Sequence, residues 1–198
     1  MTHEPAESTP LRLPPVASPT EEQRELIFNG MERDGVPLNI FTTLAHSPGL
    51  LRRVNMLGGR FLFRGKLEPR LREIVILRSA YLSGSEYEFG QHRLIGRTCG
   101  LTDTEIAALA TSDGGGGWSQ TEQLAIALAG ELHNDDVASD ATWAGLRDAL
   151  DDAQLVELLL LPGFYRMLAG FLNSAGVQLE PDAPGWPPHP AVSGATDG

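Results

Sequence analysis

Glutamate and histidine, two residue types that exchange protons, are spaced in this sequence so that they can act together. Glu88 and His92 stand four positions apart in a segment of helical periodicity, so both lie on one helix face, and Ser85 belongs to the same stripe. A carboxylate that accepts a hydrogen bond from an imidazole fixes its tautomer and raises its basicity. Such a pair is a common general acid/base unit. We therefore expect His92 to carry a proton, with Glu88 orienting its ring.

A second glutamate, Glu73, lies in the segment 69–82, which reads PRLREIVILRSAYL. This segment is apolar around most of its circumference and is typical of a buried, central helix. Glu73 shares a face with Ile76 and Ala80, and a buried carboxylate is costly without a partner. The alternative is an exposed first-turn glutamate, which the helix dipole favours. We expect the inward orientation, with Glu73 relaying the proton or holding His92 from the other side.

The pattern Glu-x-x-x-His is a weak signal alone, because helices also carry it as a solvated surface pair or as half a metal site. Nothing near His92 supplies further metal ligands, so we expect no metal. Cys99 is the only cysteine, which excludes an intrachain disulfide and a cysteine-based metal site. We expect Cys99 to be a buried small apolar residue rather than a reactive thiol.

Other side chains are candidates for substrate binding, each with a structural alternative. An arginine could neutralise a substrate carboxylate, although a surface or intersubunit ion pair is the alternative for each one. The arginine candidates are Arg78 and Arg93, followed by Arg72 and Arg97. His133 is either a pocket residue or a helix-end residue favoured by the dipole. Tyr165 either lines the pocket or packs in the core, and Ser85 would lie one turn before Glu88.

The elements that position these residues are predicted to be helices throughout. Capping-box patterns mark helix starts at Thr20, Thr102 and Ser119, with a looser version at Asp151. Further helices are expected at about 37–46, 48–64, 69–82, 87–98 and 140–149, three of them beginning at a proline, which the first helical turn tolerates. No strand-like alternation of useful length and no internal repeat is present. The predicted fold class is all-α.

Both ends of the chain differ in composition from the middle. Residues 1–19 and 181–198 contain five prolines each, and proline lacks a backbone donor and fixes φ. We expect an unstructured segment at 1–19, one helical domain over 20–180, and a Pro/Gly-rich tail at 181–198. The alternative for the tail is an arm laid across a neighbouring subunit, with Trp186 as its anchor.

The composition restricts the classes of partner. A chain of 198 residues fits one domain, and its net charge of −11 argues against nucleic acid or an anionic membrane as the main partner. The N-terminus has acids and prolines where a secretory signal needs an apolar stretch. The strongest apolar run, 155–164, is interrupted by Glu157, Pro162 and Gly163. We expect a cytoplasmic protein with a small-molecule substrate.

The order Glu73, Ser85, Glu88, His92 resembles the core of the carboxymuconolactone decarboxylase and alkylhydroperoxidase D-like family. The resemblance covers about residues 21–180. Further stretches that carry it are 71–73, 100–102, 105–106, 131–133, 139–143, 163–167 and Asn173. The peroxidase branch has Cys-x-x-Cys where this chain has Ser85 and Glu88. The resemblance implies a helical bundle that assembles into a homo-oligomer (trimer or hexamer), with the pocket near a subunit interface.

The missing cysteines argue against a thiol peroxidase, which needs a thiolate and a resolving thiol. The resemblance implies a carboxymuconolactone decarboxylase-like carboxy-lyase, a cofactor-free acid/base enzyme acting on a small organic acid or lactone. His92, Glu88 and Glu73 would be its catalytic residues. One alternative is an isomerase or cyclase of a biosynthetic pathway that uses the same proton transfer. The other is a non-catalytic oligomeric protein that binds a ligand in the pocket.

Overall fold

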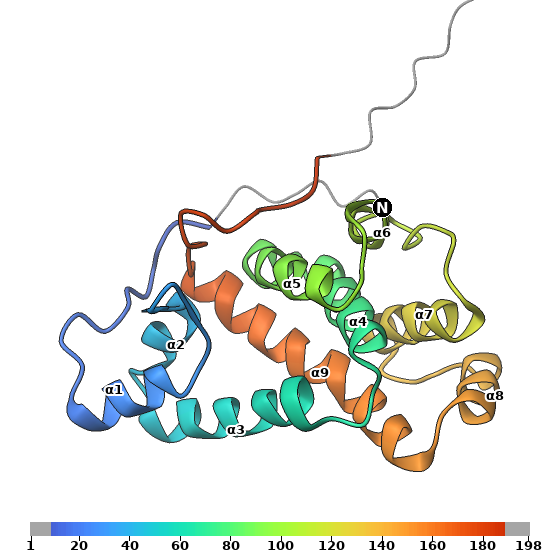
Figure 1. Ribbon diagram of the computed structural model, residues 1–198, viewed down its shortest axis with the longest axis horizontal. Helices are drawn as coiled ribbons and strands as arrows, with labels where there is room; N and C mark the ends of the chain where they lie inside the picture. Colours follow the sequence, from blue (N-terminus) through green and yellow to red (C-terminus); the bar gives the residue numbers. More distant parts are fainter. Residues whose placement is uncertain (1–8, 189–198) are drawn as a thin grey trace, which may run out of the picture.

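The computed structural model describes residues 9–188, which form nine helices and one short hairpin (Figure 1). The elements in chain order are α1 (Glu21–Phe28), β1 (Glu32–Arg33), β2 (Val36–Pro37), α2 (Asn39–Leu44), α3 (Pro48–Arg64), α4 (Pro69–Leu82), α5 (Glu86–Thr98), α6 (Asp103–Leu109), α7 (Gln120–Asn134), α8 (Asp140–Ala149) and α9 (Asp152–Ala175). The expected all-α class is confirmed apart from the hairpin.

Local sequence signals fix most of the helix boundaries. Reciprocal capping boxes form at Thr20, Thr102, Ser119 and Asp151, each satisfying two backbone donors at a helix start. The helices α3, α4 and α8 have the predicted bounds. Gly100 adopts a positive φ of 88° just after the C-cap of α5, a conformation that glycine reaches without steric cost.

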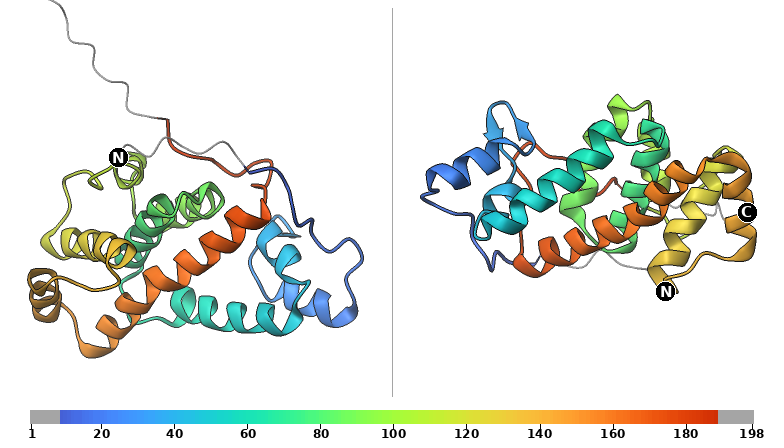
Figure 2. Two further views of the ribbon diagram at one scale, coloured as in Figure 1. Left: turned by 180° about the vertical axis from the view of Figure 1, so that it is seen from behind. Right: turned by 90° about the horizontal axis from the view of Figure 1, so that it is seen from below.

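The central helix is α4, as its composition predicts. Every residue from 71 to 80 is buried, and Ile74, Val75, Ile76 and Leu77 have no exposed surface. This helix packs against α5, α7 and α9, and α9 crosses the molecule beside it (Figures 1 and 2). Because α4 is enclosed on all sides, any polar side chain on it must find its partner inside the protein.

The N-terminal third forms a separate wall. The helices α1 and α2 pack against α3, and the hairpin connects α1 to α2 (Figure 1). Sequence analysis missed the hairpin because its strands are only two residues long, too short for an alternating pattern. Asp34 and Gly35 form the turn with φ of 51° and 78°, as an Asp-Gly hairpin turn requires. Because Val36 and Pro37 belong to β2, α2 begins at Asn39 rather than at Pro37.

The Pro-rich ends differ from the expectation of unstructured segments. Leu13 N–H donates to the carbonyl of Ala175 at 3.0 Å, which ties the segment 9–19 to the end of α9. In the segment 181–188 the Trp186 ring lies 5.0 Å from the ring of Phe89 in its own chain. Trp186 is therefore an anchor, but on its own subunit. Residues 1–8 and 189–198 lie outside the described residues.

Close approach explains a glycine in α5. A Cβ atom on Gly90 would lie 2.2 Å from the carbonyl oxygen of Pro184, so only glycine lets the C-terminal segment cross the helix here.

The helix α9 is long and apolar enough to cross a membrane by length and composition alone. It continues through Pro162, and 56% of its most apolar 18-residue window is buried inside the protein. That burial is what the core helix of a folded domain requires, so the helix is weak evidence for a membrane span.

Candidate active site

The buried pair at the centre of the molecule is His92 with Glu73. His92 Nδ1 lies 2.7 Å from Glu73 Oε2, and Glu73 has no exposed surface. The adjacent packing of α4 and α5 brings these residues together across 19 positions of sequence. The inward orientation expected for Glu73 is therefore what the structure has, and it is this glutamate that holds the imidazole.

Arg72 compensates the charge of Glu73. Its Nε donates to Glu73 Oε1 at 2.9 Å, and its Nη1 donates to the carbonyl of Leu62 at 3.0 Å. Both side chains are buried, where an unpaired carboxylate would be expensive. Because an ionised carboxylate only accepts hydrogen bonds, His92 must carry a proton on Nδ1. The other ring nitrogen, Nε2, is then left for chemistry. Arg72 serves this chain rather than a substrate carboxylate.

The expectation that Glu88 orients His92 is wrong. Both carboxyl oxygens of Glu88 are buried and have no hydrogen-bond partner among the described residues. Although Glu88 and His92 share a helix face, the ring of His92 points toward α4 and hydrogen-bonds Glu73 there. Burial without a partner raises the pKa of Glu88 well above its usual range. Burial thus favours the neutral carboxylic acid form of Glu88, which is a proton donor, over the charged form.

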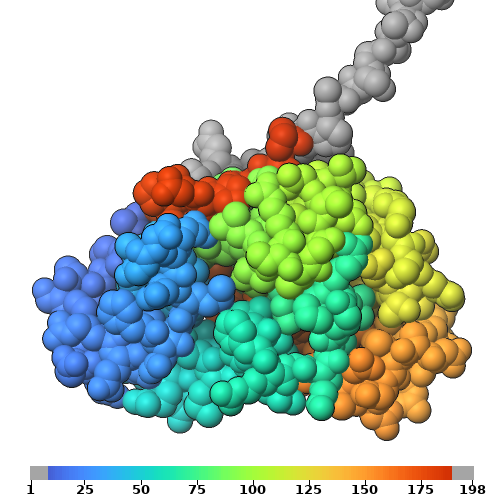
Figure 3. Space-filling model, viewed as in Figure 1, coloured from blue at the N-terminus to red at the C-terminus, as the bar shows by residue number. Residues whose placement is uncertain are grey.

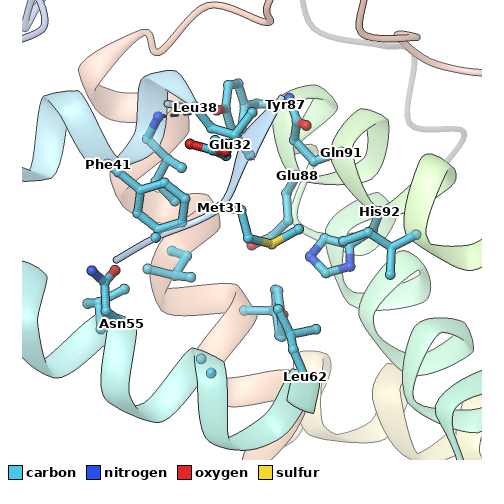
Figure 4. Close-up of a pocket in the computed structure, with 18 of the residues that line it drawn as sticks. Met31, Glu32, Leu38, Phe41, Asn55, Leu62, Tyr87, Glu88, Gln91 and His92 are labelled. Carbon is cyan, nitrogen blue, oxygen red and sulfur yellow. Dashed lines mark hydrogen bonds between the residues drawn. The ribbon is translucent and has the colours of Figure 1, made fainter. Parts of the chain in front are cut away.

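A cavity of about 320 Å³ lies between the N-terminal wall and the helices α5 and α9. A hollow at this place is visible in Figure 3, and Figure 4 shows Glu88 and His92 reaching into the cavity from α5. Its lining is largely apolar, from residues such as Phe41, Val54, Leu62, Phe164 and Leu168. Its charged or titratable lining residues are Glu32, Arg33, Tyr87, Glu88, His92 and Tyr165.

Tyr165 is the one predicted substrate-binding residue that lines this cavity. Its ring stands edge-on to the His92 ring with centroids 5.0 Å apart. Burial, assisted by the charge of Glu73, raises the pKa of Tyr165 well above its usual value. Its hydroxyl therefore stays protonated and is available as a hydrogen-bond donor.

The arginines predicted to bind substrate have structural roles instead. Arg78 donates to the carbonyls of Leu109 and Ser112 and supports the loop after α6, and burial lowers its pKa. Arg93 donates to the carbonyl of Gly185 at 2.6 Å and fastens the C-terminal segment. Neither lines the cavity, so the prediction is wrong for both.

Two further candidates also lie outside the cavity. Ser85 is the N-cap position of α5 and is fully buried, with no hydrogen-bond partner for its Oγ among the described residues. His133 lines a separate pocket of about 230 Å³, together with Asp136 and Arg166. The cavity residue that sequence analysis missed is Arg33, in the hairpin. Only the Asp-Gly turn beside it could have indicated that it belongs to an ordered element.

Residues 9–188 contain no group of three or more His, Cys, Asp or Glu side chains arranged to hold a metal ion.

Residues 48–131, from the start of α3 to α7, match the model of the carboxymuconolactone decarboxylase family. They include Glu73, Glu88 and His92. The segment 48–131 belongs to this family. No protein with a curated description matched the chain.

Several solved structures share the fold of this chain. An uncharacterized peroxidase-related protein from Silicibacter sp. has a TM-score of 0.77 at 15% identity, over 91% of this chain and 96% of that one. An uncharacterized peroxidase-related protein from Ralstonia eutropha, with an alkylhydroperoxidase AhpD core, has a TM-score of 0.75 at 18% identity, over 90% and 94%. The debrominase Bmp8 in complex with 2,3,4-tribromopyrrole has a TM-score of 0.71 at 15% identity, over 88% and 95%. The fold is therefore AhpD-like.

Replacing Cys99 with serine should leave any native turnover of this protein within about twofold, because no second thiol exists to resolve an oxidised sulfur. Cys99 lies behind the site, with Sγ 3.7 Å from Arg72 Nη2, and burial raises its pKa away from the thiolate form. A peroxide-reduction assay on both proteins checks this. Peroxide turnover that Cys99→Ser abolishes would contradict it.

Proposed function

We propose that this protein is a cofactor-free acid/base enzyme that acts on a small organic acid or lactone, as a carboxy-lyase. The observation that carries the proposal is the buried chain Arg72–Glu73–His92, which ends at an apolar cavity beside the buried, unpaired carboxyl group of Glu88. A histidine backed by a carboxylate together with a protonated glutamate is a proton-transfer pair in which each partner has one role.

In a decarboxylation, the carbon–carbon bond to the carboxylate breaks and CO₂ leaves. The electron pair moves into a conjugated carbonyl, so negative charge develops on the carbonyl oxygen. The O–H of Glu88, with the hydroxyl of Tyr165, is suited to donate to that oxygen. His92, protonated and stabilised by Glu73, then gives a proton from Nε2 to the carbon. The apolar lining keeps bulk water from competing for these donors.

One observation also favours an isomerase or cyclase. In the neutral ring that the Glu73 bond orients, Nε2 carries a lone pair toward the cavity, so His92 is suited to remove a proton as well as deliver one. Removal from carbon beside a carbonyl, followed by return at another carbon, would isomerise or cyclise the substrate with no loss of CO₂. Glu88 would stabilise the enolate in the same way.

A screen separates these reactions. Purified protein is incubated with unsaturated lactones and β-keto acids, with CO₂ release and substrate loss measured in parallel. Release of CO₂ in step with substrate loss supports the carboxy-lyase. Substrate conversion without CO₂ supports the isomerase or cyclase. Binding of these compounds with no conversion of any of them would count against both enzymes.

The scaffold itself suits a ligand of this size. The debrominase with the same fold is complexed with a small ring compound, 2,3,4-tribromopyrrole. An apolar cavity of about 320 Å³ accommodates a ring with one or two substituents, which is the size of a substituted lactone.

We further propose that the protein works as a homo-oligomer, a trimer or hexamer. Large apolar side chains stand exposed on α3 and α9, including Met56 at 71% and Phe63 at 72% of their surface, with Val156, Leu160 and Met167. Monomers seldom leave so many exposed together. Light scattering at micromolar concentration should therefore give a multiple of the 21.3 kDa chain. A single 21.3 kDa species would argue against this assembly.

A further inference from the structure

The β1–β2 hairpin forms one wall of the cavity. Its strands pair with Arg33 opposite Val36, and the Asp-Gly turn fixes this register. Met31, Glu32 and Arg33 all line the cavity. Figure 4 shows Met31 and Glu32 on the side of the cavity that faces Glu88 and Gln91. Both charged side chains of β1, Glu32 and Arg33, therefore border the space that a ligand would occupy.

Arg33 is the only arginine or lysine among the described lining residues of this cavity. Its Nη2 donates to Gln91 Oε1 at 2.7 Å. Its Nη1 is buried and has no hydrogen-bond partner among residues 9–188, and no carboxylate of those residues lies within ion-pair distance of it. Burying a guanidinium N–H without an acceptor costs free energy, and an anionic group on a ligand would remove that cost by accepting a hydrogen bond from it.

Gln91 holds the guanidinium in a fixed orientation. Its amide nitrogen donates to Glu180, so its oxygen must point toward Arg33. Glu180 is itself fixed, because its Oε1 accepts from the Tyr87 hydroxyl at 2.8 Å and from the Asn39 N–H at 2.7 Å. This network orients Arg33 through Gln91. The oxygens of Glu180 accept hydrogen bonds from Tyr87, Asn39 and Gln91, and none of them pairs with Arg33. An oriented, unpaired arginine loses little freedom when it binds a carboxylate.

We propose that Arg33 binds the carboxylate of a small, otherwise apolar organic anion at the hairpin end of the cavity. Arg33 and His92 line the same cavity, so one molecule bound there can contact both. The apolar lining then takes the body of the molecule. Arg33 is a specificity-determining residue, while Gln91 and Glu180 are positioning residues. The assignment rests on the proposed function in one respect: the end of the ligand that lies away from Arg33, near His92, is the end that reacts.

Binding of two matched probes tests this assignment without any turnover. Cinnamate carries a carboxylate on a flat apolar body, and cinnamamide is its neutral counterpart. Calorimetry should show tighter binding of cinnamate to the wild-type protein. Arg33→Gln should weaken cinnamate binding by about tenfold or more and leave cinnamamide unchanged, since a hydrogen-bonded charge is lost. Arg33→Lys should lie between the two, because it keeps the charge and loses the planar fork.

The matched control is Arg24→Gln, which removes an exposed arginine on α1 that pairs only with Glu21. It should bind both probes like the wild-type protein. Equal loss of both probes in Arg33→Gln, no preference for cinnamate, or no binding of either probe would overturn the assignment. If Arg33→Gln does not fold, the probe preference and the Arg33→Lys value decide it. His92→Gln should still bind cinnamate, so failure of the acid/base proposal remains distinguishable.

Discussion

Replacing His92 with glutamine should lower turnover on the native substrate by about 10²–10⁴-fold, the usual contribution of a general acid/base step. The amide is close in size to the imidazole and can still hydrogen-bond Glu73, but it cannot take up and release a proton. The measurement is steady-state kcat in purified protein. Circular dichroism and oligomer size should match the wild-type protein.

The partners of His92 sharpen this test. Because Glu73 acts through His92, the double variant Glu73→Gln/His92→Gln should be no slower than His92→Gln alone. Glu88 makes no bond to His92 and donates on its own, so Glu88→Gln should add its loss to that of His92→Gln. The two double variants therefore separate a coupled pair from two independent groups.

His46→Gln is the matched control, since the His46 side chain is exposed and its one hydrogen bond among residues 9–188 is to the carbonyl of Pro14. It should keep full turnover. Full turnover in folded His92→Gln would contradict the mechanism. A non-catalytic binding protein would instead show no turnover in the wild-type protein and unchanged ligand binding in His92→Gln.

The helices were predictable because their signals are local. The capping boxes at Thr20, Thr102 and Ser119 act within one turn, and the prolines that begin α3 and α4 do the same. The burial of Glu73 was also predictable, since α4 is apolar all around and leaves it no exposed face.

Which residues bond to one another was only partly predictable, because that depends on packing between elements. One of the two roles expected for Glu73, holding His92 from the other side, is what the structure has, whereas the shared face of Glu88 and His92 does not lead to a bond between them. Arg33 was missed for the same reason. Its place at the cavity depends on a hairpin of two-residue strands and on Gln91, 58 positions away.

The prediction that arginines near the motif bind substrate was wrong for Arg78 and Arg93. Arg78 and Arg93 stand close to Glu73 and His92 in the sequence, but each lies on a helix face turned toward a loop or the C-terminal segment. A charged side chain on a buried helix hydrogen-bonds the carbonyl groups that lie next to its own helix face. Being close in sequence to a cavity residue therefore does not place an arginine at the cavity.

The state of Glu88 leads to a prediction about stability. Burial raises its pKa, so the folded protein keeps the proton to a higher pH than the unfolded chain does. Below the unfolded value of about 4.3 both states are protonated and the residue has no effect on pH dependence. Above it, the unfolded chain ionises first, and the free energy of unfolding falls by about 1.4 kcal/mol per pH unit until folded Glu88 also ionises.

Glu88→Gln removes that titration, so its free energy of unfolding relative to the wild-type protein should rise with pH above the unfolded value of about 4.3, until folded Glu88 also ionises. Urea unfolding at one fixed protein concentration measures this difference, since oligomer stability depends on concentration. The buried amide of Gln changes the free energy of unfolding by the same amount at every pH. Only the slope of the difference with pH therefore depends on the ionisation of Glu88. Glu21→Gln, at an exposed glutamate paired with Arg24, should give a nearly flat difference. A slope near zero or below zero for Glu88→Gln would mean that Glu88 is ionised in the folded protein, and a charged Glu88 could not donate to a developing oxyanion.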